Sequence, residues 1–186
     1  HPIHDYFEAI ETAQKENKPV LIDFTGYGCE NCRKMEEFVW TEPDILELLQ
    51  NEVILASVYI DDKELLPENE QTSIDMGGGQ KKKIKTIGDK WSMFQQVNFN
   101  NNSQPHYVLV TPDGKVINKP VSGYMPKDDF KKFLDCGINY YKNHKKCQLL
   151  LTDSIIHNPD AERHGIKSAG RHKCFRIKKE RPYGDI

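Results

Sequence analysis

The sequence lacks any apolar run close to the roughly 18 residues that a membrane-spanning helix requires. It also begins, at His1-Pro2-Ile3-His4, without the basic and apolar segments of a secretory signal peptide. Apolar residues nevertheless make up 37% of its 186 residues, which is enough to bury a hydrophobic core. These features exclude a disordered chain, and they predict a soluble piece that is either mature or cut from a longer protein.

A strong excess of positive charge is also missing from most of the chain, although the net charge of −2 conceals an asymmetry. From Tyr141 onward there are eleven Lys or Arg against five Asp or Glu, a balance of +6, which leaves −8 on residues 1–140. An acidic body repels the phosphates of nucleic acid, so the charge argues against a nucleic-acid partner.

Cysteines are too few, at five, and too widely spaced for a scaffold held together by disulfide bonds. Only Cys29 and Cys32 form a recognisable motif, because no second Cys-x-x-Cys occurs. Cys136, Cys147 and Cys174 stand alone. We expect Cys136, in the last predicted helix, to be a small packing residue.

Hydrophobic periodicity divides the first 140 residues into helices and strands. Nearly continuous apolar runs at 20–24, 53–60 and 106–110 predict buried strands, and 115–117, after a Pro-Asp-Gly turn, predicts the second strand of a hairpin. Helical spacing predicts helices over 4–17, 29–39, 41–49, 91–97 and 130–136. The stretch 61–87 has no pattern and predicts a long surface loop, mobile at its three consecutive glycines. Beyond residue 141 only "QLLL", 148–151, is a candidate for a further strand.

This order of elements, in which strands alternate with helices before a terminal hairpin, predicts an α/β fold. The sheet should be mixed, with helices on both of its faces. We expect one domain over 1–140 and a basic extension over 141–186 that is flexible or foreign to the domain.

The Cys29/Cys32 pair lies where a strand gives way to a helix, and three uses suit such a pair. A structural zinc site needs four ligands, and the tail residues His157, His164, His172 and Cys174 have no zinc-site spacing. A purely structural disulfide across three residues closes too small a loop to stabilise the fold much. Redox exchange suits the position best, because the helix N-terminus stabilises a thiolate on the first cysteine. Cys29 would then be the exposed nucleophile and Cys32 the buried resolving cysteine.

Two further features fit redox exchange. Asp23 lies inside an apolar strand six residues before Cys29, where a buried carboxylate, its pKa raised by desolvation, would exchange a proton with Cys32. The alternative is a partly exposed acid at a strand end. Gln104-Pro105 begins a strand, and a cis bond there would present backbone to a partner chain. A trans proline at the first residue of a strand is the alternative.

Taken together, several segments resemble the thioredoxin fold, and specifically the C-terminal extracytoplasmic domain of thiol:disulfide interchange proteins of the DsbD type. They are "LIDFTGYGCENCRKMEE", "YIDD", "TIGDKWSMFQQ", "NNNSQPHYVLV" and "GY" before the last helix, within about residues 5 to 137. The resemblance implies a thioredoxin-like fold in which 61–87 is a long insertion ahead of the helix that precedes a cis-proline.

For individual residues, the resemblance implies that Cys29 is the nucleophile, Cys32 the resolving cysteine and Asp23 the acid beneath them. It implies that Glu36 is a second acid near the site, with an ordinary exposed helix residue as the alternative. Pro105 matches the cis-proline, and Tyr27, Gly28, Gln104 and Pro105 are the expected contacts to a substrate protein.

The implied activity is that of a protein-disulfide reductase or electron relay with no cofactor beyond its redox-active disulfide and no metal. Its expected partners are oxidised proteins and an upstream donor, a membrane-embedded thiol relay domain. The expected location is periplasmic or otherwise extracytoplasmic, and the expected state is a monomer. Two alternatives remain open: a non-catalytic module that binds metal or peptide through the same pair, and a thiol peroxidase or haem-protein maturation reductase on the same fold.

The residues between the cysteines predict a reducing potential. Glu30 and Asn31 stand where thioredoxins have Gly-Pro, and the Glu30 carboxylate opposes negative charge on Cys29. We therefore expect a potential near that of thioredoxin, about −270 mV. Equilibration against glutathione or dithiothreitol buffers measures it, and a value above about −180 mV would contradict a role as a reductant.

Overall fold

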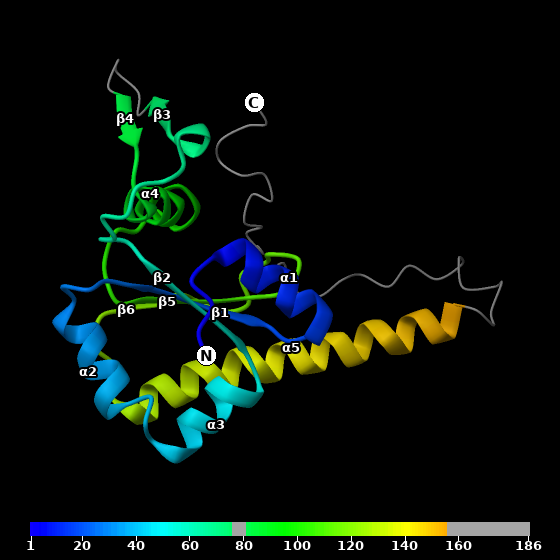
Figure 1. The fold of residues 1–186 in the computed structure, drawn as a ribbon. Coiled ribbons are helices and arrows are strands. Elements are labelled where there is room, and N and C mark those ends of the chain that lie inside the picture. Colours follow the sequence, from blue (N-terminus) through cyan, green and yellow to red (C-terminus); the bar gives the residue numbers. More distant parts are fainter. Residues whose placement is uncertain (76–80, 156–186) are drawn as a thin grey trace.

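The computed structural model describes residues 1–75 and 81–155, and its centre is a four-stranded mixed sheet (Figure 1). The strand order is β2-β1-β5-β6, with β1 parallel to β2 and antiparallel to β5. The strands are β1 (Val20–Thr25), β2 (Ile54–Tyr59), β5 (His106–Val110) and β6 (Val121–Ser122). Every residue of β1 is buried, as its unbroken apolar run predicts for a central strand. The predicted α/β fold with a mixed sheet is confirmed.

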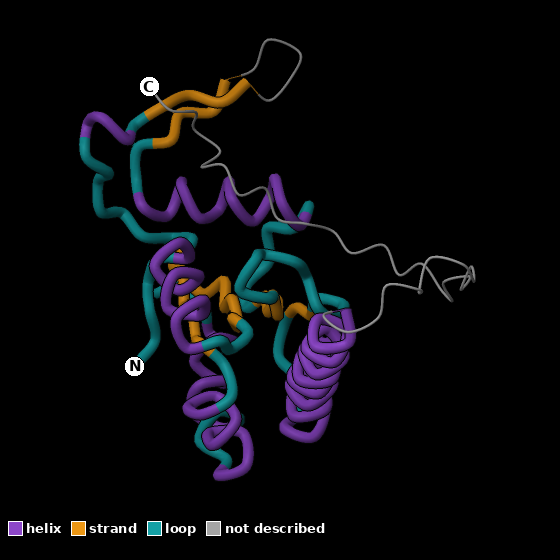
Figure 2. The backbone as a smooth tube through the Cα atoms, turned by 90° about the vertical axis from the view of Figure 1, so that its right-hand side faces the viewer, coloured by secondary structure: helices purple, strands orange, loops and turns teal. Residues whose placement is uncertain are grey.

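Helices cover both faces of this sheet, as Figures 1 and 2 show. On one face α1 (Tyr6–Glu16) and α4 (Ile87–Phe99) pack against Val20, Ile22 and Phe24. On the other, α2 (Glu30–Phe38), α3 (Pro43–Asn51) and α5 (Lys127–Ile155) pack against a cluster that includes Leu21. Side chains alternate along a strand, so Asp23 shares the face of Leu21, beneath α2.

The helix ends follow local sequence signals. Asp5 caps α1 by accepting hydrogen bonds from the backbone N–H groups of Phe7 and Glu8 at 2.7 and 3.2 Å. The same helix ends at Asn17, which adopts the left-handed conformation with a φ of 55°. Thr86 and Asp89 form a reciprocal capping box at the start of α4. These caps determine where α1 and α4 begin on their face of the sheet.

The predicted hairpin after β5 is only partly correct. The chain returns beside β5 and pairs at Val116 with Val110, but 115–117 forms no strand. Pairing resumes at β6, which lies opposite His106 and Tyr107. Between the two contacts the side chain of Asn118 donates a hydrogen bond to the carbonyl of Phe133 in α5 at 2.9 Å. This bond ties the chain to α5 at the point where the pairing with β5 is interrupted.

The prediction of a patternless loop over 61–87 is wrong for part of its length. A short 3₁₀ turn (Glu68–Glu70) is followed by a two-stranded sheet of β3 (Thr72–Asp75) and β4 (Lys81–Ile84). Its small core of Leu66, Ile84 and Met93 attaches it to α4. Lysine and other polar residues occupy most positions of these strands, so the hydrophobic pattern gives little signal. The glycine triplet lies outside the described residues.

The last helix also differs from the prediction. α5 runs through residue 140 to Ile155, so "QLLL" belongs to a helix and not to a strand. None of the described helices combines the length and the apolar character needed to span a bilayer. Cys136 is exposed, which contradicts its expected packing role. The rest of the predicted basic extension, residues 156–186, lies outside the described residues, so the domain boundary at 140 stays a prediction.

The core on the α1/α4 face should account for much of the stability. Phe94 is 2% exposed and contacts Tyr6, Phe24 and Trp91, so Phe94→Ala should lower the free energy of unfolding by about 3 to 5 kcal/mol. Phe38→Ala, at a side chain that is 58% exposed, is the matched control and should change it by less than about 0.5 kcal/mol. Urea unfolding measures both, and equal losses would contradict this packing.

Candidate active site

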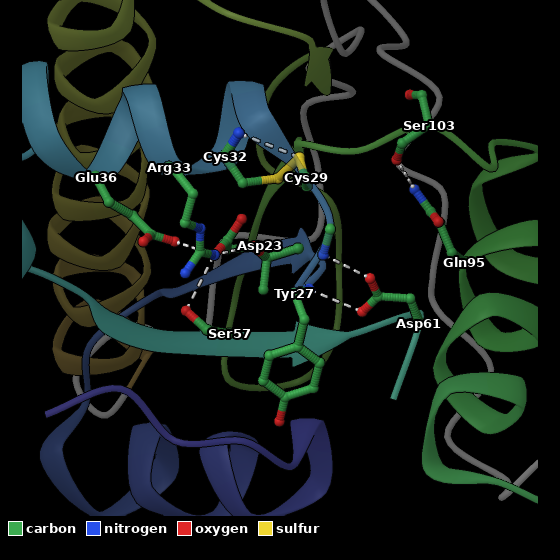
Figure 3. Close-up of a disulfide and its surroundings, with 12 residues drawn as sticks. Asp23, Tyr27, Cys29, Cys32, Arg33, Glu36, Ser57, Asp61, Gln95 and Ser103 are labelled. Atoms are coloured by element: carbon green, nitrogen blue, oxygen red, sulfur yellow. Dashed lines mark hydrogen bonds and ion pairs between the residues drawn. A yellow bond between two sulfur atoms is a disulfide. The ribbon is translucent and has the colours of Figure 1, made fainter. Parts of the chain in front are cut away.

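A disulfide joins Cys29 and Cys32 at the N-terminus of α2 (Figure 3). Cys29 is the N-cap residue, and its Sγ accepts a hydrogen bond from the backbone N–H of Cys32 at 3.1 Å. Cys29 is 6% exposed and Cys32 is 1% exposed. Cys29 is therefore the more accessible of the two, although the sequence-based expectation of an exposed residue is wrong. A thiolate on Cys29 would face the unpaired N–H groups of the first turn of α2.

The carboxyl group of Asp23 is buried beneath this pair. It is 1% exposed, and its Oδ2 accepts a hydrogen bond from the Ser57 hydroxyl of the neighbouring strand at 3.0 Å. Within the described residues Oδ1 has no hydrogen-bond partner. Desolvation raises the pKa of Asp23 to about 7, with the Ser57 hydrogen bond acting in the opposite direction. Asp23 can therefore hold or release a proton near neutral pH.

Glu36 and its ion-pair partner Arg33 each act on this buried acid through their charges. The Arg33 guanidinium donates to Glu36 Oε1 at 2.7 Å and to Thr25 Oγ1 at 3.2 Å. Partial burial raises the pKa of Glu36, against the opposing effect of Arg33. Glu36 in turn raises the pKa of Asp23, and Arg33 lowers it. Glu36 is thus a half-buried acid that is coupled to Asp23, and not an ordinary exposed helix residue.

Glu30, the residue after Cys29, is paired with a lysine. Its side chain is 81% exposed and forms an ion pair with Lys34 at 2.7 Å, one turn along α2. The hydrogen bond and the charge of Lys34 lower the pKa of Glu30. Lys34 offsets part of the negative charge beside Cys29, so Glu30 should oppose a Cys29 thiolate less than the sequence alone suggests.

The turn before Cys29 carries Tyr27, the exposed aromatic residue of the site. Tyr27 is 64% exposed and stacks on Tyr59 with ring centroids 4.3 Å apart. Its hydroxyl donates to Asp62 Oδ2 at 3.3 Å. Asp61 accepts hydrogen bonds from the backbone N–H groups of Tyr27 and Gly28 at 2.9 and 3.0 Å. The ring is therefore fixed in place at the surface beside the disulfide.

Gln104 and Pro105 lie at the same edge of the sheet. The bond between them is cis, and the two residues directly precede His106, which pairs with Phe24 near the end of β1. A methyl group on Gly26 would collide with Gln104 Oε1 and lie 2.8 Å from Asp61 Oδ2. The structure thus brings the expected substrate contacts Tyr27, Gly28, Gln104 and Pro105 to the edge that holds the disulfide.

Sequence reasoning missed four residues that shape the site: Ser57, Arg33, Asp61 and Gln95. Gln95 is fully buried, and its amide nitrogen donates to the carbonyl of Ser103 at 2.8 Å, just before Gln104 (Figure 3). The place of Asp61 near the site could have been predicted from the sequence. It follows β2, which is parallel to β1, and parallel strands end at the same edge of a sheet. The sequence gives no such indication for Ser57 and Gln95, because a polar residue within an apolar element does not reveal its partner.

A comparison with known families identifies the domain. The model of the thioredoxin-like domain family matches residues 6–137. Among curated proteins, thiol:disulfide interchange protein DsbD from two strains of Campylobacter jejuni is 33% identical over 52 residues. That alignment covers 26% of this chain and 9% of DsbD, so the chain matches a small part of that protein.

Solved structures share the fold at low sequence identity. The DsbH oxidoreductase superposes with a TM-score of 0.53 at 15% identity, covering 74% of this chain and 83% of that one. The reduced C-terminal domain of Neisseria meningitidis DsbD superposes with a TM-score of 0.51 at 18% identity, covering 73% and 98%. Its oxidised form gives 0.50 at 17% identity, covering 74% and 99%. At these identities the likeness extends to the fold.

The buried acid should make stability depend on pH. An Asp23 whose pKa is raised from 3.8 to about 7 keeps its proton in the folded state after the unfolded state has lost it. Stability should therefore fall as the pH rises from about 4 to 7, by roughly 4 kcal/mol in all. Asp23→Asn should remove most of this fall and stabilise the oxidised protein at pH 8. Urea unfolding across pH 4–8 measures the effect.

The matched control for this prediction is Asp128→Asn, at an exposed carboxylate in the first turn of α5. This change should leave the pH profile within about 0.5 kcal/mol of wild type. An Asp23→Asn protein whose stability still falls over the same range would show that another group causes the dependence.

Proposed function

Because the chain belongs to the thioredoxin-like domain family and carries the Cys-x-x-Cys pair of a thiol–disulfide oxidoreductase, we propose that it reduces disulfide bonds in other proteins or relays electrons to them. The observation that carries this proposal is the position of the pair. One cysteine caps a helix and keeps some accessible surface, and the second lies one turn further above a buried acid.

The proposed exchange has two steps. The Cys29 thiolate attacks one sulfur of the partner's disulfide, forming a mixed disulfide and releasing a thiolate on the partner that takes up a proton. Cys32 then loses its proton and attacks Cys29 Sγ, which breaks the mixed disulfide and releases the partner's second sulfur. Two electrons pass to the partner, and the Cys29–Cys32 disulfide remains.

Asp23 is the proposed acceptor for the proton of Cys32. Its raised pKa lets it take up that proton near neutral pH, which a carboxyl group with an ordinary pKa does poorly. Glu36 raises this pKa and Arg33 lowers it through their charges. The reaction should be slower below pH 7, where Asp23 is already protonated.

The proposed partners follow from the DsbD-type resemblance. They are oxidised proteins outside the cytoplasm and an upstream donor, a membrane-embedded thiol relay domain, with the chain acting as a periplasmic or otherwise extracytoplasmic monomer. The exposed Tyr27 ring, together with Gly28, Gln104 and Pro105 along one edge of the sheet, supports a docking place for a partner segment next to Cys29.

Replacement of the resolving cysteine tests the proposal. Cys32→Ser should stop insulin reduction, because the mixed disulfide on Cys29 can no longer be released. The variant should instead accumulate covalent adducts with oxidised proteins, and dithiothreitol should release these proteins by reducing the mixed disulfide. Non-reducing gel electrophoresis and mass spectrometry of the purified protein detect them.

Cys136→Ser is the control, because Cys136 is exposed and takes no part in the disulfide. This variant should reduce insulin at the wild-type rate and trap nothing. A wild-type protein that neither reduces insulin nor yields adducts through Cys29 would favour a non-catalytic binding module.

A further inference from the structure

One carboxylate accepts hydrogen bonds from two backbone N–H groups of the turn before Cys29. Asp61 Oδ1 accepts from the N–H of Tyr27 at 2.9 Å, and Oδ2 accepts from the N–H of Gly28 at 3.0 Å (Figure 3). In this view Asp61 reaches the turn from one side, whereas Asp23, Arg33 and Glu36 lie on the other. The turn thus has a carboxylate of its own, separate from the acids beneath the disulfide.

The backbone around Asp61 is held on two sides. Towards the sheet, the N–H of Ile60 donates to the carbonyl of Thr25 at 2.9 Å, which fixes the end of β2 against β1. Towards α4, the N–H of Gly88 donates to the carbonyl of Asp62 at 3.1 Å, and a methyl group on Gly88 would lie 2.6 Å from the backbone of Asp62. Asp61 therefore cannot shift without moving β2 or α4.

The turn is also shaped to receive this side chain. Gly26 has no side chain to block the approach, since a methyl group there would lie 2.8 Å from Asp61 Oδ2. A methyl group on Gly28 would lie 3.7 Å from the same oxygen, an ordinary van der Waals distance. Both glycines of the Gly26-Tyr27-Gly28 turn thus face one carboxylate.

This arrangement acts on Cys29 in two ways. The Asp61 carboxylate places a negative charge against Gly28, the residue that precedes Cys29, and like charges disfavour a thiolate. It also accepts from two N–H groups of the turn, which therefore do not donate to the thiolate. Both effects oppose the reduced form, whereas the N-terminus of α2 favours it.

We propose that Asp61 is a positioning residue, which holds the turn before Cys29 and so makes the Cys29–Cys32 pair more reducing. This inference rests on the proposed thiol–disulfide function and adds the residue that sets how readily the pair gives up its electrons. Asp61 acts through the backbone of Tyr27 and Gly28 and takes no proton in the reaction.

Asp61→Asn tests the proposal, because it removes the charge and one of the two acceptors. In equilibrium with glutathione, the equilibrium constant should shift three- to tenfold towards the reduced protein, which corresponds to a potential about 15 to 30 mV less negative. The midpoint of the pH profile for alkylation of Cys29 should move to lower pH. A merely structural role would move neither quantity.

Asp62→Asn is the matched control. It makes the same change of charge one residue away, but the Asp62 side chain contacts the Tyr27 hydroxyl and the N–H of Glu64, not the turn backbone. Its equilibrium constant should stay within twofold of wild type. Equal shifts in the two variants would overturn the proposal in favour of a general charge effect.

Gly26→Ala is a second route should Asp61→Asn fail to fold. The added methyl group collides with Gln104 Oε1 and also presses on the Asp61 carboxylate, 2.8 Å from Oδ2, without removing any charge. Displacement of the carboxylate from the two N–H groups should shift the equilibrium in the same direction. A folded variant of either kind with an unchanged potential contradicts the inference. Failure of the proposed function is seen separately, as a wild-type protein that does not equilibrate with glutathione or reduce insulin.

Discussion

The burial of one carboxyl group, that of Asp23, is the constraint on which the site depends. A charge in the central strand of a sheet is costly to bury. Within the part of the chain that the structure describes, Asp23 accepts one side-chain hydrogen bond, from Ser57, and its pKa is raised to about 7. The disulfide lies above this group because α2 begins directly after β1 and packs over the same face. The buried Asp23 carboxyl group that can exchange protons near the sulfur atoms therefore lowers the stability of the fold.

The acids of the site act from two sides and through different contacts. Asp23 lies beneath the pair and feels the charges of Glu36 and Arg33, which form an ion pair with each other. Asp61 approaches from the end of β2 and accepts hydrogen bonds from the backbone of the turn. Each opposes negative charge near Cys29, and the N-terminus of α2 favours it. The balance between these groups, more than the cysteines themselves, should determine when the pair reacts.

Several of the wrong predictions from the sequence share one physical cause. The β3–β4 sheet is built largely from lysine and other polar residues, and its small core depends on Met93 of α4, so its own sequence carries little hydrophobic pattern. The strand expected at 115–117 forms only an isolated bridge to β5, and the chain beyond it bonds to α5 through Asn118. In both cases a contact with a distant element overrides the local preference.

The sequence by itself determined the central strands, the helices around them and the position of Cys29 and Cys32 at a helix start, because apolar periodicity and capping residues act locally. It also indicated Asp23, since a lone acid in an apolar strand is visible without a structure. Only the tertiary structure decided that Ser57 faces Asp23 and that Asp61 bonds to the turn at Tyr27 and Gly28. These contacts join residues more than thirty positions apart, and the register of β1 against β2 creates them.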